Sequence, residues 1–97
     1  MPEPDAVPPI RRNDDRLRFE VEVEGQVAEL TYERRDGAIH YTHTRVPKAL
    51  EGRGIAGRLA TAALDYAREA GLAVVPECPY VRAYIEKHPA YADLVRS

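Results

Sequence analysis

The 97-residue sequence has one cysteine, one methionine, one phenylalanine and no tryptophan. Cys78 has no partner for an internal disulfide, so we expect a chain that lives in a reducing, cytoplasmic environment. No apolar run approaches the roughly 20 residues that cross a bilayer, and residues 1–5 lack the positive charge and apolar stretch of a signal peptide. The formal net charge of −2 favours neither nucleic acid nor a membrane surface as a partner.

Residues that bind metals are equally sparse. The three histidines and Cys78 show no spacing typical of zinc, and the carboxylates do not gather as they do in calcium or magnesium sites. His40 and His43 lie three residues apart on one predicted strand, which would place them on opposite faces of a sheet. We therefore predict no metal site.

A chain of this length suffices for one domain with a modest core. Residues 1–14 hold four of the eight prolines and show little periodicity. We interpret them as a flexible N-terminal lead-in, and residues 15–97 as a single folded domain.

Three consecutive segments predict an antiparallel meander. Residues 17–23 alternate apolar and charged side chains with period two. Residues 27–34 run back after the tight turn Glu24-Gly25, with Val27 among their apolar members. Asp36-Gly37 is a strong signal for a type I′ hairpin turn, and it leads into a third strand over 38–46.

The second half of the chain changes to a helical period. An apolar stripe from Ile55 to Ala67 predicts a helix that ends at Gly71. Residues 72–75 are all apolar, as in a buried parallel strand, and complete a right-handed βαβ crossover. A second helix is predicted from Cys78-Pro79 to Pro89. The expected fold class is α/β (α+β): a meander leading into a βαβ unit, with a second helix covering the sheet.

Three glycines, Gly52, Gly54 and Gly57, lie between the third strand and the first helix. The first amides of a helix have no internal acceptor, and the helix dipole adds partial positive charge there. A glycine-rich turn at this junction predicts an anion cradle, because Gly54 and Gly57 let the backbone approach a phosphate closely. Arg53 and Arg58 would add charge toward phosphate groups.

The residues Glu51 to Ala56 follow the pattern Gln/Arg-x-x-Gly-x-Gly/Ala, with Glu51 in place of the usual first residue. His43-Thr44-x-Val46-Pro47 precedes the motif, and Val75-Pro76-x-Cys78-x-Tyr80-Val81 follows it. Over about residues 16–95 the chain resembles the GNAT family of acetyl-CoA-dependent N-acetyltransferases, in particular its very short single-domain (YjdJ-type) members. An acid beside a pyrophosphate is unfavourable, so Glu51 is expected to point to solvent without a role.

The resemblance implies a compact acyl-CoA N-acyltransferase fold with acetyl-CoA as co-substrate. It places Val46 beside the pantetheine arm. The residues it implies around the phosphates of the co-substrate are Arg53, Gly54, Ile55, Ala56, Gly57 and Arg58.

Two residues are candidates for catalysis, Cys78 and His43. Cys78 is predicted at the N-cap of the second helix, where the dipole favours a thiolate. It would accept the acetyl group, move a proton, or only pack as a small hydrophobe, and these alternatives stay open. His43, which alternation places on the face of Tyr41, is a candidate general base or a structural histidine.

The tyrosine that commonly serves as general acid in this family has no counterpart at the same position of this sequence. Members of the family commonly protonate the departing thiolate with a tyrosine on the second helix. The aligned segment is Tyr84-Ile85-Glu86-Lys87, so the tyrosine position holds Ile85 and Tyr84 lies on another helical face. Tyr80 is expected to pack at the rim of the core or to line the acyl channel.

The function expected from these observations is transfer of an acetyl group to a primary amine. So short a chain lacks the N-terminal helices that shape the acceptor pocket of longer family members, so the acceptor site should be open. A protein, peptide or polyamine amine would suit it. The alternatives are a CoA or acyl-CoA binding module with little or no turnover, and a domain that binds another nucleotide or phosphate.

Overall fold

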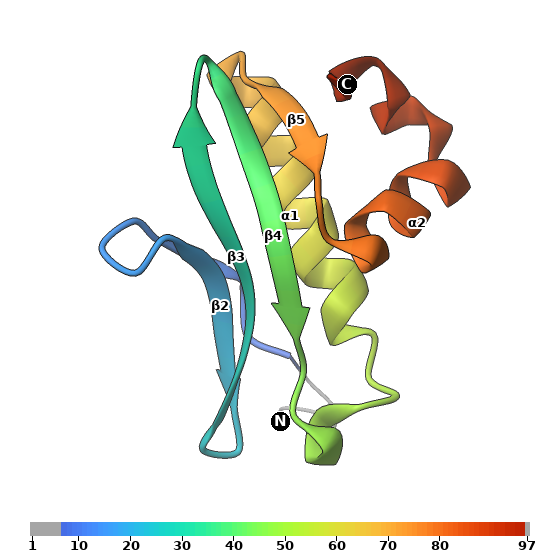
Figure 1. The fold of residues 1–97 in the computed structure, drawn as a ribbon. Coiled ribbons are helices and arrows are strands. Elements are labelled where there is room, and N and C mark those ends of the chain that lie inside the picture. The colour runs from blue at the N-terminus through green and yellow to red at the C-terminus, as the bar shows by residue number, and fades with distance from the viewer. Residues whose placement is uncertain (1–6, 97) are drawn as a thin grey trace.

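Four antiparallel strands begin the fold. They are β1 (Arg11–Asn13), β2 (Arg18–Val23), β3 (Gln26–Arg35) and β4 (Ala38–Arg45). β1 pairs with β2, β2 with β3, and β3 with β4. A computed structural model describes residues 7–96 (Figure 1). The predicted meander is confirmed, with one strand more than expected.

The extra strand β1 falls within residues 1–14, for which a flexible lead-in is predicted. Residues 1–6 of that segment lie outside the described part of the chain. β1 is a charged edge strand of three residues, Arg-Arg-Asn, so it has no apolar alternation from which a strand could be recognised.

The predicted βαβ unit and second helix are also confirmed. A short 3-10 helix, η1 (Lys48–Leu50), leads to α1 (Ile55–Ala70), which ends at Gly71 in the left-handed conformation with φ 69°. β5 (Ala73–Pro76) then pairs parallel to β4. The chain closes with α2 (Pro79–Lys87) and a second 3-10 helix, η2 (Pro89–Leu94). Figure 1 shows α1 packed behind the sheet and α2 beside β5.

The predicted type I′ turn at Asp36-Gly37 is confirmed, and the tight turn at Glu24-Gly25 has the same geometry. Glu24 and Gly25 have φ of 53° and 78°, and Asp36 and Gly37 have φ of 54° and 74°. Positive φ at both central residues is the signature of a type I′ turn, whose twist matches that of the flanking strands. These turns set the register of the meander.

The core lies between the sheet and α1. The buried residues of β3 are Ala28, Leu30 and Tyr32, which follow the period of two. Tyr41 is fully buried, and its hydroxyl donates to the carbonyl of Ala63 in α1 at 2.5 Å. The sheet side of the core also includes Phe19, Val21, Val23 and Ile39, and α1 contributes Leu59, Ala60, Ala63, Leu64 and Ala67.

A β-bulge in β4 reverses the alternation of its side chains. Tyr41 lies opposite Tyr32, but the next rung of the ladder joins His43 to Thr31, so Thr42 is an extra residue. The buried Tyr32 and Tyr41 point toward α1, and His43, beyond the bulge, therefore points away from it.

The prediction that His43 shares the face of Tyr41 is therefore wrong, as is the prediction that His40 and His43 lie on opposite faces. His40 pairs with Glu33 and His43 with Thr31, both on the side of the sheet away from α1. Strict alternation fails because one inserted residue shifts the period by one. Thr44, opposite the buried Leu30, turns toward the core side instead.

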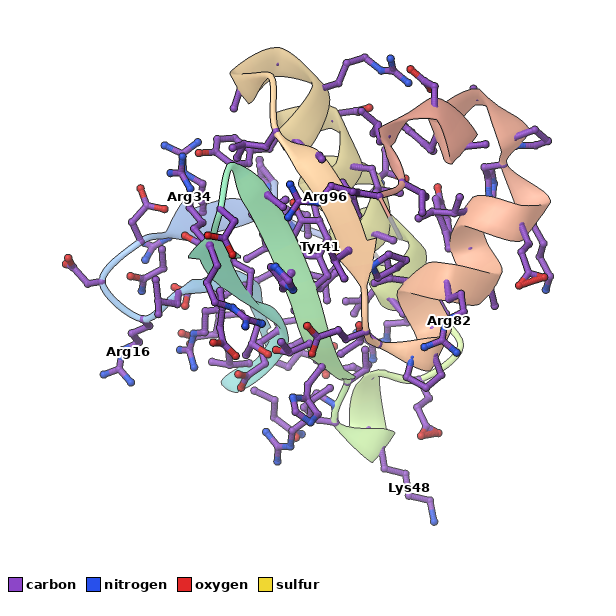
Figure 2. The ribbon with its side chains drawn as sticks, turned by 45° about the horizontal axis from the view of Figure 1, so that its top comes forward. Arg16, Arg34, Tyr41, Lys48, Arg82 and Arg96 are labelled. Atoms are coloured by element: carbon purple, nitrogen blue, oxygen red, sulfur yellow. The ribbon has the colours of Figure 1, made fainter. Side chains whose placement is uncertain are left out.

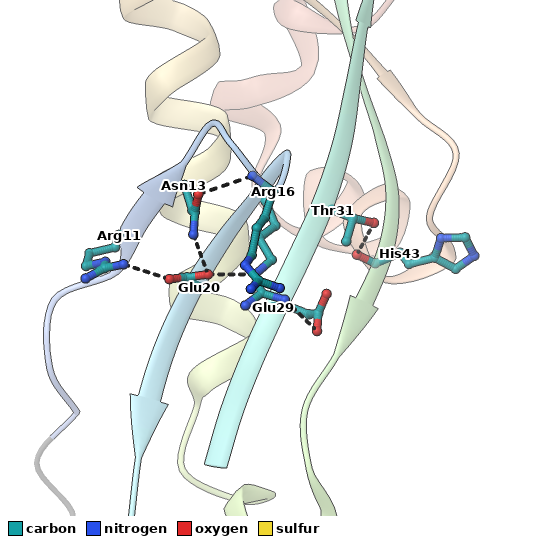
Figure 3. A network of polar contacts seen from close by, with 8 residues as sticks. Arg11, Asn13, Arg16, Glu20, Glu29, Thr31 and His43 are labelled. Carbon is teal, nitrogen blue, oxygen red and sulfur yellow. Dashed lines mark hydrogen bonds and ion pairs between the residues drawn. The ribbon is translucent and has the colours of Figure 1, made fainter. Parts of the chain in front are cut away.

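We call the side of the sheet away from α1 the polar face; it carries Arg18, Glu20, Glu29, Thr31, Glu33, His40 and His43. Figure 3 shows part of it as a network around Glu20. One carboxylate oxygen of Glu20 accepts from Arg18 at 2.6 Å and from Asn13 at 3.3 Å, and the other accepts from Arg11 at 2.9 Å. This network joins β1 to β2.

The outer edge of β5 is covered by the end of the chain. Val95 forms a parallel bridge with Val74, and the amide of Arg96 donates to the carbonyl of Val74 at 2.8 Å. None of the helices in residues 7–96 has the length and apolar character needed to cross a membrane.

The Glu20 network predicts a loss of stability in acid. The hydrogen bond from Arg18 lowers the pKa of Glu20 from its ordinary value, with smaller contributions from Asn13 and the charge of Arg11. A lowered pKa stabilises the fold above the unfolded-state value, and this contribution disappears as pH falls through the folded value. We expect Glu20→Gln to cost about 0.5–1 kcal/mol in urea unfolding at pH 7 and almost nothing at pH 2.

Glu22→Gln is the matched control, because Glu22 lies on the same strand and is exposed. An equal loss for both variants at pH 7, or a loss for Glu20→Gln that persists in acid, would show that the network does not stabilise the fold by charge.

Candidate functional site

The parallel strands β4 and β5 separate partway along β4. Their pairing runs from Ala38 opposite Ala73 to Tyr41 opposite Pro76. One further bond, from the amide of Cys78 to the carbonyl of Tyr41 at 2.9 Å, follows. Beyond this bond β4 continues to Arg45, while the segment that follows β5 turns into α2 (Figure 1). We call the resulting gap the split.

The glycine turn, residues 52–57, leads into α1 next to the split. Gly54 is the N-cap of α1 with φ 73°, and its carbonyl accepts the first helical bond from the amide of Arg58 at 3.1 Å. The amides of Ile55, Ala56 and Gly57 have no acceptor within residues 7–96. The first turn contains no acidic residue, so the dipole's positive end is not neutralised there.

A hollow of about 250 Å³ lies against this turn. Its lining brings together Val46, Gly54, Ile55, Ala56 and Gly57, which are five of the residues predicted to contact the co-substrate. Leu50, Glu51, Gly52 and Tyr80 complete the lining. Glu51 is exposed, as expected, but it borders the hollow.

The two predicted phosphate-binding arginines lie at the margin instead. Arg53 pairs with Glu24 of the β2–β3 turn at 2.5 Å, and Arg58 donates to the carbonyl of Val7 at 3.3 Å. Neither side chain lines the hollow. The Arg53–Glu24 pair places a carboxylate beside a cation that lies two residues before Ile55.

Cys78 is the N-cap of α2, and Pro79 occupies the first helical position, as predicted. The thiol makes no capping bond. Its sulfur lies 3.3 Å from the hydroxyl of Thr44, and Cys78 is 4% exposed. The contact joins the two sides of the split, because Thr44 belongs to β4 and Cys78 to the segment that follows β5.

The two tyrosines of α2, Tyr80 and Tyr84, differ in whether their hydroxyls form a hydrogen bond. The hydroxyl of Tyr84 hydrogen-bonds to Thr61 of α1, and Ile85 is buried in the core. Tyr80 is 39% exposed and lines the hollow, and its hydroxyl has no hydrogen-bond partner within residues 7–96. Burial raises the pKa of Tyr80, and Tyr84 adds to the shift, so the hydroxyl stays protonated at neutral pH.

The structure does not bring the two predicted catalytic residues together. His43 is exposed on the polar face, whereas Cys78 is buried with Thr44. Sequence reasoning missed the contact of Thr44 with Cys78, because strict alternation would place Thr44 on the polar face. The bulge that turns it inward has no glycine or proline to reveal it in the sequence.

A second hollow, of about 240 Å³, lies at the opposite edge of the sheet. It is lined by Pro8, Pro9, Arg11, Glu20, Val21, Glu22 and Val27. It contains none of the predicted site residues. Among the described residues, His, Cys, Asp and Glu side chains form no group of three that could hold a metal ion.

Comparison with known proteins identifies the family. The sequence pattern of the GCN5-related N-acetyl-transferase family matches residues 18–94. Protein NATD1 of mouse and of human are each 42% identical to this chain over 86 residues, which cover 84% of it and 78% and 76% of theirs. The NMR structure of a GCN5-like protein from Staphylococcus aureus superposes with a TM-score of 0.71 at 28% identity, covering 91% of this chain and 87% of that one.

The chain therefore belongs to the GCN5-related N-acetyltransferase family, as the sequence motifs indicate, and the expected fold is confirmed.

The geometry of the glycine turn predicts opposite effects for two similar substitutions. Gly54→Ala should destabilise the protein by about 1 kcal/mol, because an L side chain at φ 73° is strained even with space around it. Gly57→Ala should be neutral or stabilise by up to about 1 kcal/mol, since Gly57 is helical and the added carbon would meet Tyr80 Oη at an ordinary 3.6 Å.

Urea unfolding of the two variants beside the wild type measures the difference. Equal effects of the two alanines would contradict the left-handed N-cap at Gly54.

Proposed function

We propose that this protein binds acetyl-CoA and transfers the acetyl group to a primary amine. The observation that supports the proposal most is the hollow at the start of α1, where three unbonded amides, Ile55, Ala56 and Gly57, border a space lined by Val46 and Tyr80. Free helix amides bind pyrophosphate well, since they add directed donors to the helix dipole.

The split fits the rest of such a ligand. β4 is paired on its β3 side as far as Arg45, but its pairing with β5 ends at Tyr41. The backbone of residues 42–46 therefore presents an open strand edge toward α2. An amide-containing arm, such as pantetheine, can add to an open edge as an extra strand would. Val46 lies where this edge meets the hollow.

Cys78 is the residue we propose as the acetyl carrier. In the first step its sulfur would form a bond to the acetyl carbon, the carbon–sulfur bond of acetyl-CoA would break, and the thiol proton would pass to the CoA sulfur. In the second step the amine nitrogen would bond to the same carbon, the bond from that carbon to the Cys78 sulfur would break, and a proton from the nitrogen would return to the sulfur. Thr44, 3.3 Å from the sulfur, supports the charged intermediate as a hydrogen-bond donor.

Tyr80 is the alternative source of the proton for departing CoA, and with it the amine would attack acetyl-CoA directly. Its hydroxyl borders the hollow and is protonated at neutral pH. Ile85, in the position where the family's pattern has tyrosine, has no proton to give, and the Tyr84 hydroxyl is bonded to Thr61.

A CoA-binding module with little turnover is the second candidate function. It is favoured by the same two observations, a buried Ile85 and an engaged Tyr84, because they remove the usual proton donor. Both candidates require CoA binding, and only the first requires acetyl transfer.

Binding is tested by thermal shift with CoA, acetyl-CoA, ATP and NAD. We expect only the two CoA species to raise the melting temperature. Arg53→Ala should weaken CoA binding about tenfold through loss of a charged phosphate contact, and Glu24→Gln should tighten it, because it removes the carboxylate beside Arg53.

Arg16→Ala is the control, since Arg16 points away from the body of the protein (Figure 2). Failure of both CoA species to move the transition would reject the proposed function. An unchanged CoA affinity in Arg53→Ala would show instead that this arginine only links the turn of β2–β3 to the loop.

Acetyl transfer through Cys78 is tested by intact mass spectrometry. Incubation with acetyl-CoA alone should add the mass of one acetyl group to the wild type and to Tyr80→Phe, and nothing to Cys78→Ala. If Cys78→Ala acetylates amines as fast as the wild type while Tyr80→Phe is about 100-fold slower, the direct route with Tyr80 as acid replaces the carrier.

Binding of CoA without an adduct on the protein, and without acetylation of any amine in a broad panel, would favour the binding module.

A further inference from the structure

The polar face carries a histidine–carboxylate pair at the point where β4 and β5 separate. His40 lies opposite Val75, on the rung before the last pair, Tyr41 and Pro76. Glu77 comes next in the chain and immediately precedes Cys78. The pair therefore borders the split on the side away from α1, whereas the sulfur of Cys78 contacts Thr44, which turns toward the core side.

Glu77 orients His40. The Nδ1 atom of His40 lies 2.7 Å from Glu77 Oε2 and 3.2 Å from Nη2 of Arg35, which also lies 3.4 Å from the same carboxylate oxygen. The contact with the carboxylate is the shorter one, and an ionised carboxylate can only accept, so we assign Nδ1 as the donor and the lone pair of His40 to Nε2. The His40 side chain is 12% exposed and that of Glu77 is 45% exposed, so this geometry is fixed at a surface that solutes reach.

Two acceptor atoms of the pair are unused. Within residues 7–96, neither Nε2 of His40 nor Oε1 of Glu77 takes part in a hydrogen bond. One basic nitrogen is thus left on the side of the ring away from Glu77. An alkylammonium group can donate a hydrogen bond to it.

We propose that His40 receives the acceptor amine as an alkylammonium ion, with His40 Nε2 removing its proton and Glu77 holding the opposite ring nitrogen. The inference rests on the proposed function and adds the acceptor side to it. Loss of one proton to Nε2 leaves a neutral amine, and His40 becomes an imidazolium paired with Glu77. The amine nitrogen then bonds to the acetyl carbon, the carbon–sulfur bond breaks, and the second nitrogen proton passes to the departing sulfur.

This arrangement separates the two substrates in space. The hollow and the open edge of residues 42–46 serve the donor, whereas His40 and its partner Glu77 lie on the polar face. The acceptor would approach from the polar face. The end of a lysine side chain and the end of a polyamine both present the required alkylammonium.

The test is steady-state kinetics at saturating acetyl-CoA with three acceptors: a lysine-containing peptide, spermidine and an arylamine. The arylamine is neutral at pH 7.5, so it needs neither the charge of Glu77 nor a base. Glu77→Gln should lower kcat for the alkylammonium acceptors about fivefold with little change in KM, because the imidazolium of His40 loses its ionised partner. His40→Gln should lower their kcat about 100-fold. Neither variant should alter arylamine turnover or the affinity for CoA.

Glu33→Gln is the matched control. Glu33 lies opposite His40 on the same face and also pairs with Arg35, at 3.9 Å, but it belongs to β3 and does not border the split. It should behave as wild type with every acceptor. Circular dichroism confirms folding, and Glu77→Gln, at an exposed position, keeps the test valid if His40→Gln does not fold.

Turnover by the wild type with kinetics unchanged in Glu77→Gln and His40→Gln would overturn this inference and leave the proposed function standing. Equal losses for arylamine and alkylammonium acceptors would also overturn it, because they would indicate a structural role. No turnover with any acceptor would reject both. Faster turnover of the peptide than of spermidine, or the reverse, assigns the source of the ammonium group.

Discussion

The bond between the amide of Cys78 and the carbonyl of Tyr41 is the constraint on which the site depends. Within the described residues it is the last backbone hydrogen bond between β4 and the segment that follows β5, and the two segments separate beyond it. Tyr41 is itself fixed by the bond from its hydroxyl to the carbonyl of Ala63, so the sheet, α1 and the start of α2 meet at one buried residue. The position of the split follows from this junction.

The bulge at Thr42 determines which chemistry each side of the split carries. Without the extra residue, His43 would face the core side and Thr44 the polar face. With it, Thr44 contacts the sulfur of Cys78, and two histidines lie on the polar face. One inserted residue therefore separates a thiol–hydroxyl contact from imidazole side chains across the thickness of a sheet, which is consistent with the frequent use of bulges near active sites.

Much of the fold was predictable because it depends on local signals. The two type I′ turns, the apolar stripe of α1, Gly71 at its end and Pro79 after Cys78 each follow from the conformational limits of a few neighbouring residues. The glycine turn was predictable for the same reason. β1 was not, since its pairing depends on contacts of Arg11 and Asn13 with Glu20 rather than on a pattern within the strand. The faces of His40 and His43, the Thr44–Cys78 contact and the His40–Glu77 pair all depend on non-local register, which periodicity alone cannot supply.

The bridge between Val95 and Val74 has a consequence for the protein in concentrated solution. An unpaired strand edge is a template on which another molecule can add a strand. Here the last residues of the chain occupy that edge of β5, and the amide of Arg96 takes the carbonyl of Val74 that a neighbouring molecule would otherwise bind. Residues 95 and 96 thus cover the part of this edge at Val74, on the strand whose continuation holds Cys78, and leave less of it open to pairing with another molecule.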